Sequence, residues 1–143
     1  MNRIKFIVPL SFLVLIIALG LNACGGNDQG KGESINNGMA LFKTNCSACH
    51  QTDGGGLAGL YPPLKNSDYF KANHAKLPCI IRNGLNGEIT VNGVKFDQQM
   101  PGIGSLSPAE IADISNYVMN NFNELNTYTN TDEVTKTLST CNN

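Results

Sequence analysis

Two cysteines and a histidine are grouped in the segment Cys46-Ser47-Ala48-Cys49-His50. Two thiols separated by two residues can each add to one vinyl group of a porphyrin, which attaches a haem covalently to the chain. The histidine that directly follows the second thiol can then bind the haem iron on one face. The segment therefore predicts a haem c attached at Cys46 and Cys49, with His50 as the first axial ligand of the iron.

A pair of thiols at this spacing has two other uses in proteins, a zinc site and a redox-active dithiol. A zinc site would require two further ligands, and the candidates His74, Cys79 and Cys141 do not have the spacing of a zinc ribbon. A thioredoxin-like dithiol would require a βαβ frame, which the sequence lacks. Attachment of haem is therefore the interpretation that the segment favours.

The second axial face of the iron needs another ligand, for which the sequence offers four candidates. Met100 lies in residues 98–102, where proline and glycine follow it and no regular structure is expected, so the chain can cross a haem face there. Met39 and Met119 lie in expected helices, where methionine commonly fills the core, and His74 lies among polar residues. We expect Met100 to bind the iron, since a thioether favours the reduced state. A buried Met100 beside five-coordinate iron is the alternative.

The chain begins with a segment that predicts export. Residues 1–23 combine two early positive charges with a long apolar run, the arrangement of a secretory signal peptide. Cys24 follows Leu21-Asn22-Ala23, which resembles the lipoprotein box of bacteria, where this cysteine receives a lipid and becomes the mature N-terminus. Cleavage near Ala23 without a lipid and an uncleaved membrane anchor are the alternatives. All three interpretations place the folded part outside the cytoplasmic membrane.

The rest of the chain is long enough for one domain with a thin core. Removal of residues 1–23 leaves 143 − 23 = 120 residues, which supports a single domain. Residues 24–34 are polar and rich in glycine, and we expect them to form a flexible tether. The domain itself is expected over residues 35–123, followed by a C-terminal extension over 124–143. A haem would supply apolar surface that the side chains of this domain do not.

The charge of the chain argues against nucleic acid as a partner. The sequence has 10 Lys and Arg against 11 Asp and Glu, a formal net charge of −1. Loss of Arg3 and Lys5 with the leader would give 8 − 11 = −3. Binding to nucleic acid needs a basic surface that neutralises phosphates, and the sequence has no run of like charge.

The elements that must position these residues are expected to be helices. Apolar residues at helical spacing predict a helix over residues 35–46, with Ser34 as its N-cap. The sequence Ser-Pro-Ala-Glu at residues 107–110 predicts the start of a helix that reaches about residue 122. The expected fold is all-α, with about four to five short helices around one haem. Shorter helices are expected over residues 68–73, 78–82 and 132–138, and a tiny hairpin around residues 89–91.

With these features the sequence resembles the class I monohaem cytochromes c. Gly38 and Phe42 precede the first haem cysteine by eight and four residues. The family has this spacing in its first helix, where the glycine lets the last helix cross closely. Ile114 and Tyr117 stand where the family places an apolar and an aromatic residue against that crossing. The resemblance covers about residues 36–122 and implies the fold of that family.

Three further residues belong to this resemblance. Pro62 lies twelve residues after His50 and, with Leu64, forms Pro-x-Leu. In the family the carbonyl of this proline accepts a hydrogen bond from the ligand histidine, and the leucine packs on the haem. Arg82 resembles a residue that pairs with a haem propionate in bacterial members, and an ordinary surface arginine is the alternative.

Two features depart from the family, Cys79 and the tail rich in asparagine and threonine that ends near Cys141. The sequence has five cysteines, and one for the lipid and two for the haem leave these two in an oxidising compartment. We expect them to form a disulfide that ties the C-terminal extension to the haem domain. Two unrelated thiols are the alternative.

The resemblance implies an electron carrier that is no enzyme by itself and has no small-molecule substrate. Its partners would be redox proteins of a respiratory chain, such as an oxidase, a reductase or a dehydrogenase. It would face the periplasm or the outer side of the cytoplasmic membrane, held there by the lipid on Cys24. The alternatives are a haem enzyme or gas sensor with a labile sixth ligand, and a cytochrome subunit fixed in a larger respiratory complex.

Overall fold

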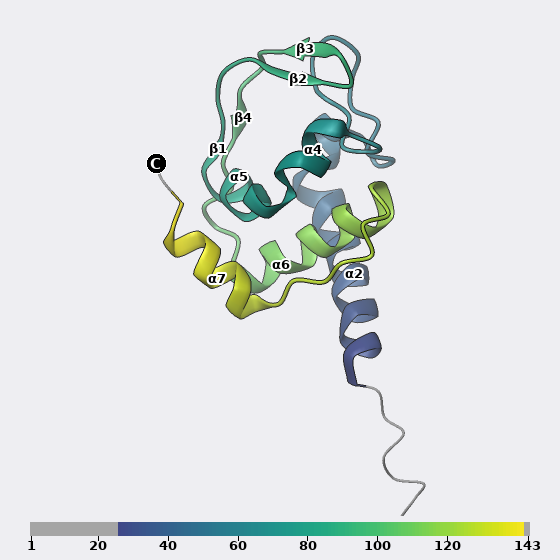
Figure 1. Ribbon diagram of the computed structural model, residues 1–143, viewed down its shortest axis with the longest axis vertical. Coiled ribbons are helices and arrows are strands. Elements are labelled where there is room, and N and C mark those ends of the chain that lie inside the picture. The colour runs from purple at the N-terminus through teal and green to yellow at the C-terminus, as the bar shows by residue number, and fades with distance from the viewer. Residues whose placement is uncertain (1–25, 142–143) are drawn as a thin grey trace, which may run out of the picture.

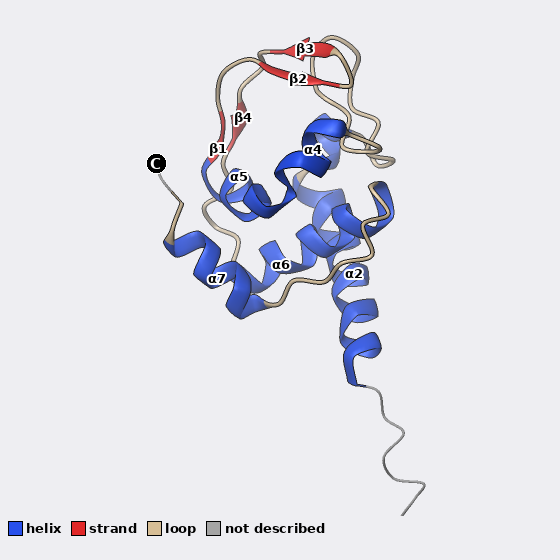
Figure 2. Ribbon diagram, viewed as in Figure 1, coloured by secondary structure: helices blue, strands red, loops and turns tan. Residues whose placement is uncertain are grey.

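The computed structural model describes residues 26–141, and short helices make up most of this part (Figure 1). Figure 2 shows the helices together at one end and the strands at the other. The elements in chain order are α2 (Gly26–Asn45), α3 (Ser47–His50), α4 (Asp68–Asn73), the 3-10 turn η1 (His74–Lys76), α5 (Leu77–Asn83), β1 (Gly84–Leu85), β2 (Ile89–Val91), β3 (Val94–Phe96), β4 (Met100–Pro101), α6 (Pro108–Tyr117), the π-helical turn η2 (Val118–Phe122) and α7 (Thr131–Ser139).

Helices α2 and α6 cross each other (Figure 1), and Gly38 lies at the crossing, as the resemblance implied. A Cβ atom on Gly38 would overlap the carbonyl group of Asp113 and would lie 2.8 Å from Cβ of Tyr117. No side chain fits between the two backbones at this point, so only glycine permits the approach. The close crossing places the next turn of α2, which leads to Cys46, against the end of α6.

Three aromatic rings fill the space beside the crossing. The ring centroids of Phe42 and Tyr117 are 5.5 Å apart, and Phe122 lies 5.2 Å from Phe42 and 5.1 Å from Tyr117. Ile114 is buried on the same face of α6, with 1% of its surface exposed. Tilted and edge-to-face rings at this distance are favourable packing beyond the area that they bury. These residues fix the angle between α2 and α6.

The expected flexible tether over residues 24–34 is a helix from Gly26 onward, and Ser34 lies within α2 and is not its N-cap. Ser34 is buried, and its Oγ donates to Oδ1 of Asp113 at 2.6 Å and accepts from Nδ2 of Asn116 at 2.9 Å. Nζ of Lys31 donates to Oδ1 of Asn126 at 2.8 Å. The polar composition indicated a segment that could not pack against the domain. In the structure, hydrogen bonds to α6 and to Asn126 hold this segment in place. Cys24 and residues 1–23 lie outside the described residues.

The strands form two small antiparallel pairs. The hairpin of β2 and β3 was expected, and its turn at Asn92-Gly93 has positive φ angles of 50° and 79° at the two positions. The pairing of β1 with β4 was not expected, and it sets Leu85 opposite Met100. Met100 therefore lies in a short strand and not in a stretch without regular structure.

The other helices begin and end close to the predicted residues. Oγ of Ser67 accepts from the backbone N–H of Phe70 and caps α4. Helix α5 ends at Gly84, which has a φ of 83°. Ser107 and Glu110 form the reciprocal capping box at the start of α6. Local signals of this kind depend on neighbours in the sequence, so they can be recognised without the fold.

Removal of the Ser107 cap should lower the stability of the fold. Ser107→Ala deletes the acceptor for the backbone N–H of Glu110, and we expect the free energy of unfolding to fall by about 1 kcal/mol. Hydrogen bonds from the backbone N–H and the hydroxyl of Ser107 also hold the pKa of Glu110 below its ordinary value of 4.5. This contribution is present above pH 4.5 and is lost as the pH falls through the lowered pKa of the folded state.

Urea unfolding at neutral and at acid pH measures both effects. Glu110→Gln is the matched control, because it removes the titrating carboxylate and leaves Ser107 in place. It should lack the part of the acid sensitivity that the parent protein shows below pH 4.5. If the Ser107→Ala variant were as stable as the parent protein at both pH values, Ser107 would not stabilise the fold as an N-cap.

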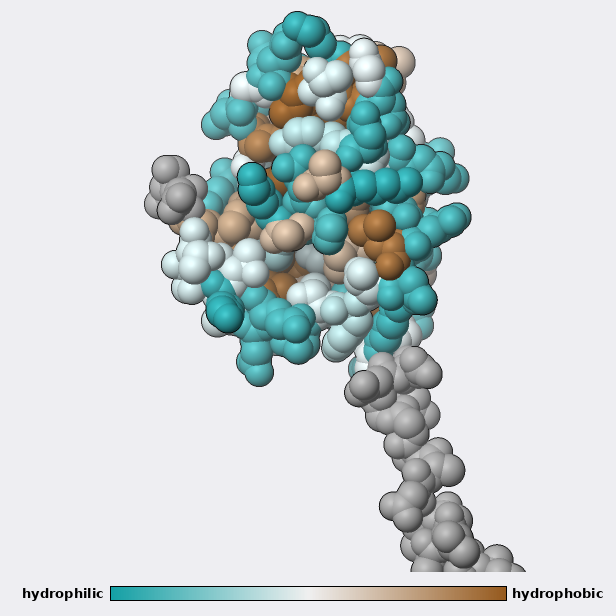
Figure 3. Space-filling view, in the orientation of Figure 1, coloured by the Kyte–Doolittle hydropathy of each residue, from teal (hydrophilic) through white to brown (hydrophobic). Residues whose placement is uncertain are grey.

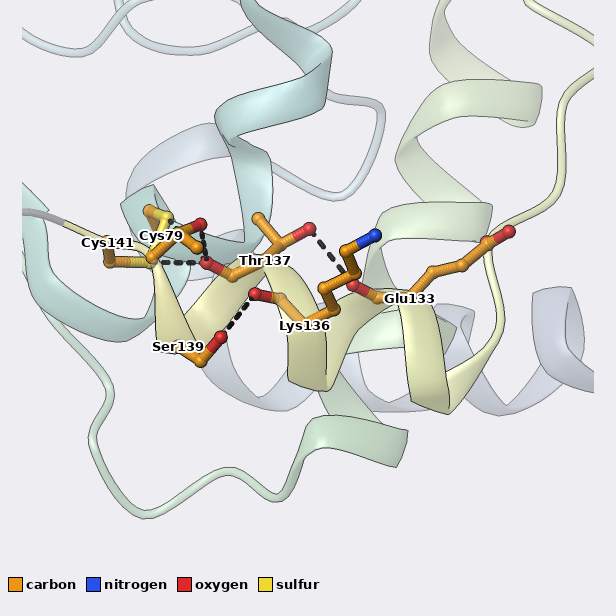
Figure 4. The surroundings of a disulfide bond; sticks show 7 residues. Cys79, Glu133, Lys136, Thr137, Ser139 and Cys141 are labelled. Atoms are coloured by element: carbon orange, nitrogen blue, oxygen red, sulfur yellow. Dashed lines mark hydrogen bonds between the residues drawn. A yellow bond between two sulfur atoms is a disulfide. The ribbon is translucent and has the colours of Figure 1, made fainter.

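The C-terminal extension folds back on the domain, and Figure 4 shows where it is attached. Helix α7 packs on α5 and α6, and Val134 of α7 is fully buried in the core. Cys79 of α5 and Cys141, which follows α7, form a disulfide, with Cα atoms 5.6 Å apart. The extension is therefore an integral layer of the structure, covalently joined to α5.

Candidate functional site

A cavity with an almost wholly apolar lining lies between the cysteine segment, α4, α5 and the strands. The empty space that these residues surround, counted together with the open mouth, is about 1090 Å³. Residues from both ends of the chain meet here, among them Phe42, Leu64, Phe70, Ile81 and Val118. A large apolar group would complete the thin core that the composition indicates.

Cys46 and Cys49 line this cavity, and within the described residues they are the cysteines with free thiols. Burial, and to a lesser degree the neighbouring Cys49, raise the pKa of Cys46 to about 11. Catalytic dithiols instead need a lowered pKa so that the thiolate forms at neutral pH. The raised pKa of Cys46 therefore disfavours a redox-active dithiol, and the place of both cysteines in the lining is compatible with two thiols presented to a bound group.

His50 is buried in the lining of the same cavity, and its Nδ1 donates to the carbonyl oxygen of Pro62 at 3.1 Å. A carbonyl can only accept, so the proton lies on Nδ1 and the lone pair of Nε2 is free for a metal. Burial lowers the pKa of His50, although the bond to Pro62 opposes the shift. The ring is thus neutral at neutral pH, the form that binds iron, and the hydrogen bond that the resemblance implied is present.

The loop between His50 and α4 brings Pro62 to this position. The backbone N–H of Gly56 donates to the carbonyl of His50 at 3.0 Å. A Cβ atom on Gly56 would lie 2.7 Å from the carbonyl oxygen of Pro62, and its φ of 68° also favours glycine. Further along, the backbone N–H of Leu64 donates to the carbonyl of Gly54 at 2.8 Å. These contacts fold the loop on itself and leave Pro62 and Leu64 against the cavity.

Of the four candidates for the second axial ligand, Met100 lines the cavity and the other three do not. Met39 has 51% of its surface exposed on α2. Met119 is buried, and its sulfur accepts from the hydroxyl of Thr127 at 3.4 Å. His74 is exposed, with Nδ1 at 2.9 Å from the backbone carbonyl oxygen of Lys71 in α4. The cavity therefore brings together His50 and Met100, and no other candidate of the set.

Arg82 is not among the residues that line the cavity. Its guanidinium Nη1 donates to the carbonyl oxygen of Gly104, on the segment that follows β4. The structure therefore does not place Arg82 in the pocket that the resemblance implied. Gly104 was not recognised as a partner, because 22 residues separate the two in the sequence.

Sequence reasoning missed much of the apolar lining. Ile89, Val91 and Phe96 of the hairpin line the cavity, as does Leu85 of β1. The spacing of two between Ile89 and Val91 is the signal of one face of a strand, and the register sets Phe96 opposite Ile89. With strands of three residues this signal is too short to show which face is inside.

Zinc does not fit the site. Within residues 26–141, no group of three or more His, Cys, Asp or Glu side chains is arranged to hold a metal ion. Cys79 and Cys141 are joined to each other, and His74 is exposed. Two thiols, one neutral imidazole with a free Nε2 and one thioether around an apolar cavity instead fit a covalently bound haem.

Comparison with known proteins agrees with this geometry. The family model for cytochrome c matches residues 35–122. Cytochrome c-552 of Thermus thermophilus is 31% identical over 83 residues, which cover 55% of this chain and 63% of that protein. The cytochrome c subunit of a quinone alcohol dehydrogenase from Gluconacetobacter polyoxogenes is 34% identical over 84 residues, 57% of this chain and 18% of that subunit. The chain thus spans less than two thirds of the length of these relatives.

The match and the site cover the same part of the chain. Residues 35–122 hold the cysteine segment, the loop with Pro62, the two short sheets, all of α6 and the part of α2 from residue 35 onward. The apolar cavity between them provides the place for the cofactor that the family carries. The chain therefore belongs to the cytochrome c family, as a class I cytochrome with one covalently bound haem c.

Proposed function

We propose that this protein carries single electrons between redox proteins. In this proposal the haem is attached through Cys46 and Cys49, and its iron is bound by His50 and Met100. The observation that carries the proposal is the position of Met100, which lines the cavity with His50 while Met39, Met119 and His74 do not. A site with both axial positions filled by the chain suits electron transfer, because no position is open to a substrate.

The haem supplies the change between ferrous and ferric states, and the chain determines how easily that change occurs. Pro62 holds the ring of His50 in one orientation and keeps Nε2 unprotonated. Leu64, Phe42 and other apolar side chains line the cavity, and low polarity disfavours the additional positive charge of the ferric state. Met100 adds a soft ligand that favours the ferrous state.

A haem enzyme or gas sensor would need a labile sixth ligand. Met100 is held by the pairing of β4 with β1, which sets it opposite Leu85. This pairing restrains the backbone of Met100 and of Pro101, which follows it, so the proposed ligand does not lie in an unrestrained loop. The observed geometry therefore favours electron transfer over an enzyme or a sensor.

Absorption spectra of the purified protein test the proposal. We expect a low-spin spectrum in both redox states, no rapid change when carbon monoxide is added to the reduced protein, and a redox titration that fits one electron. High-spin reduced protein that binds carbon monoxide rapidly would contradict the proposal and would favour the enzyme or sensor.

The partners that we propose are redox proteins of a respiratory chain, such as an oxidase, a reductase or a dehydrogenase. Figure 3 shows a face on which hydrophilic residues are interspersed with separate hydrophobic ones, without one dominant apolar area. Such a surface suits brief, weak contacts. A fixed subunit of a larger complex is the second candidate, supported by the relative that is a dehydrogenase subunit. Copurification from detergent-solubilised membranes at a constant ratio would favour the subunit.

We also propose that the protein is exported and anchored by lipid on Cys24, which lies outside the described residues with the signal sequence 1–23. Among residues 26–141, no helix is both long and apolar enough to cross a bilayer. The proposal rests on the composition of residues 1–23 and on the resemblance of Leu21-Asn22-Ala23-Cys24 to a lipoprotein box.

The replacement Cys24→Ala should release the haem protein from the membrane or leave its precursor uncleaved, because the thiol that receives the lipid is absent. Haem attachment should be unchanged, since Cys46 and Cys49 are intact. Intact mass spectrometry of membrane-extracted parent protein should show acyl chains on a mature N-terminus at Cys24. A different mature N-terminus would exclude this form of anchoring.

A further inference from the structure

The end of α5 and the segment 100–104 are in direct backbone contact. A Cβ atom on Gly84 would overlap the carbonyl oxygen of Met100 and would lie 2.7 Å from the backbone nitrogen of Gly102. A Cβ atom on Gly102 would lie 2.6 Å from the carbonyl oxygen of Arg82. Two glycines therefore allow the two chain segments to pack without any side chain between them, so movement of one segment displaces the other.

Hydrogen bonds join the same two segments. The backbone N–H of Ile103 donates to the carbonyl of Ile81 at 2.8 Å, and the guanidinium of Arg82 donates to the carbonyl of Gly104. The pairing of β1 with β4 continues this contact, with Gly84 opposite Pro101 and Leu85 opposite Met100. The position of Met100 is therefore set by α5 and the strand that follows it.

Helix α5 is in turn held by the C-terminal extension. Cys79 of α5 is bonded to Cys141, and α7 packs on α5 (Figure 4). The extension is fixed elsewhere as well, because Val134 is fully buried and the backbone N–H of Thr129 donates to Oδ1 of Asn116 at 2.8 Å. The disulfide thus connects α5 to a layer that is itself attached to α6.

We propose that Cys79, Cys141 and Arg82 are positioning residues for the axial ligand Met100. The disulfide braces α5 from the side of the extension, and Arg82 joins α5 to the segment that follows Met100. The extension, which lies outside the part of the chain that matches the family, thereby stabilises the methionine in its place. This inference rests on the proposed ligation by Met100.

The double variant Cys79→Ala, Cys141→Ala tests whether the disulfide braces α5 and thereby positions Met100; we call this role the brace. We expect carbon monoxide to bind the reduced variant about twofold to thirtyfold faster than the parent protein, the range for coupling through a packed network. The near-infrared band of a methionine bound to ferric iron should weaken, and the amide proton of Ile103 should exchange faster. Ser34→Ala is the control, because it removes buried hydrogen bonds to Asp113 and Asn116 of α6 and leaves the bond between Cys79 and Cys141 in place.

The two proposals can fail separately. A parent protein without the near-infrared band would contradict ligation by Met100, and the brace with it. A parent protein with the band, but equal changes in the double variant and in Ser34→Ala at matched stability, would overturn the positioning role of the disulfide alone, since the disulfide would then act only on overall stability.

Arg82 provides a test that leaves the disulfide intact. Arg82→Gln should raise the rate of carbon monoxide binding, as the double variant does, because the hydrogen bond from Arg82 to Gly104 is lost. Arg82→Lys, which retains a charged donor, should restore part of the effect. Unchanged carbon monoxide binding and Ile103 exchange in Arg82→Gln would overturn the positioning role, also in the case that the double variant does not accumulate.

Discussion

Met100→Ala should abolish the weak near-infrared band of the oxidised protein and open the reduced iron to carbon monoxide. The reduction potential should fall by on the order of 0.1 V, a modest part of the roughly 0.8 V that axial ligands span. The physical reason is the loss of a soft thioether that favours ferrous iron, and its replacement by water or a nitrogen base. Covalent haem should remain, because Cys46 and Cys49 do not depend on the axial bond. Absorption spectra and a redox titration measure these changes.

The other candidate ligands provide the controls for this experiment. Met39→Ala and His74→Ala change exposed side chains that do not line the cavity, and Met119→Ala changes a buried one. All three should keep the band, and the last should lose stability alone. Survival of the band in Met100→Ala would show that another residue binds the iron.

Gly38→Ala should destabilise the protein by several kcal/mol. In a helix interior the change from glycine to alanine is normally favourable by about 1 kcal/mol. At residue 38 the added methyl would overlap the backbone of Asp113 and press on Cβ of Tyr117, so α2 and α6 must separate. Separation would also disturb the aromatic cluster around Phe42, and overpacking costs typically about 1–3 kcal/mol or more. Chemical unfolding measures the loss.

Gly32→Ala is the matched control in the same helix. A Cβ atom at this position would meet nothing within 4 Å, so only the helix propensity changes. We expect a gain of about 0.5–1 kcal/mol in the free energy of unfolding. A lower free energy of unfolding for Gly38→Ala and a higher one for Gly32→Ala would support the close crossing. Equal gains in both variants would mean that the helices do not approach closely at residue 38.

The helices of the domain were largely predictable because their boundaries are marked locally. Ser67, Gly84 and Ser107 act as caps or stops through neighbours three or four residues away. The predicted start of the first helix, at residue 35, was wrong, because α2 begins at Gly26. The partners of its polar residues lie far away in the sequence: Ser34 donates a hydrogen bond to Asp113, which is 79 residues further along the chain. Interactions over such distances depend on the tertiary structure and leave no pattern in the local sequence.

The residues of the candidate site also differ in how far the sequence could predict their positions. The cysteine segment could be interpreted because a covalent reaction fixes its spacing. Pro62 was assigned by resemblance to the family, and the structure brings it to His50. The pairing of β1 with β4 involves two residues on each side, which is too little for a periodic signal. Arg82 was assigned to the pocket by resemblance, but the direction of a long side chain depends on its surroundings.

The bond between Cys79 and Cys141 encloses a ring of chain with a sequence separation of 62 residues. In the unfolded state this ring restricts the volume that the chain can explore, and loop-closure entropy of this size corresponds to about 4 kcal/mol in the chain-entropy model. The ring contains Met100 and excludes His50, so the two proposed axial ligands belong to differently constrained parts of the unfolded chain. An unfolded molecule with an intact disulfide therefore searches fewer conformations for the Met100 half of the site than for the His50 half.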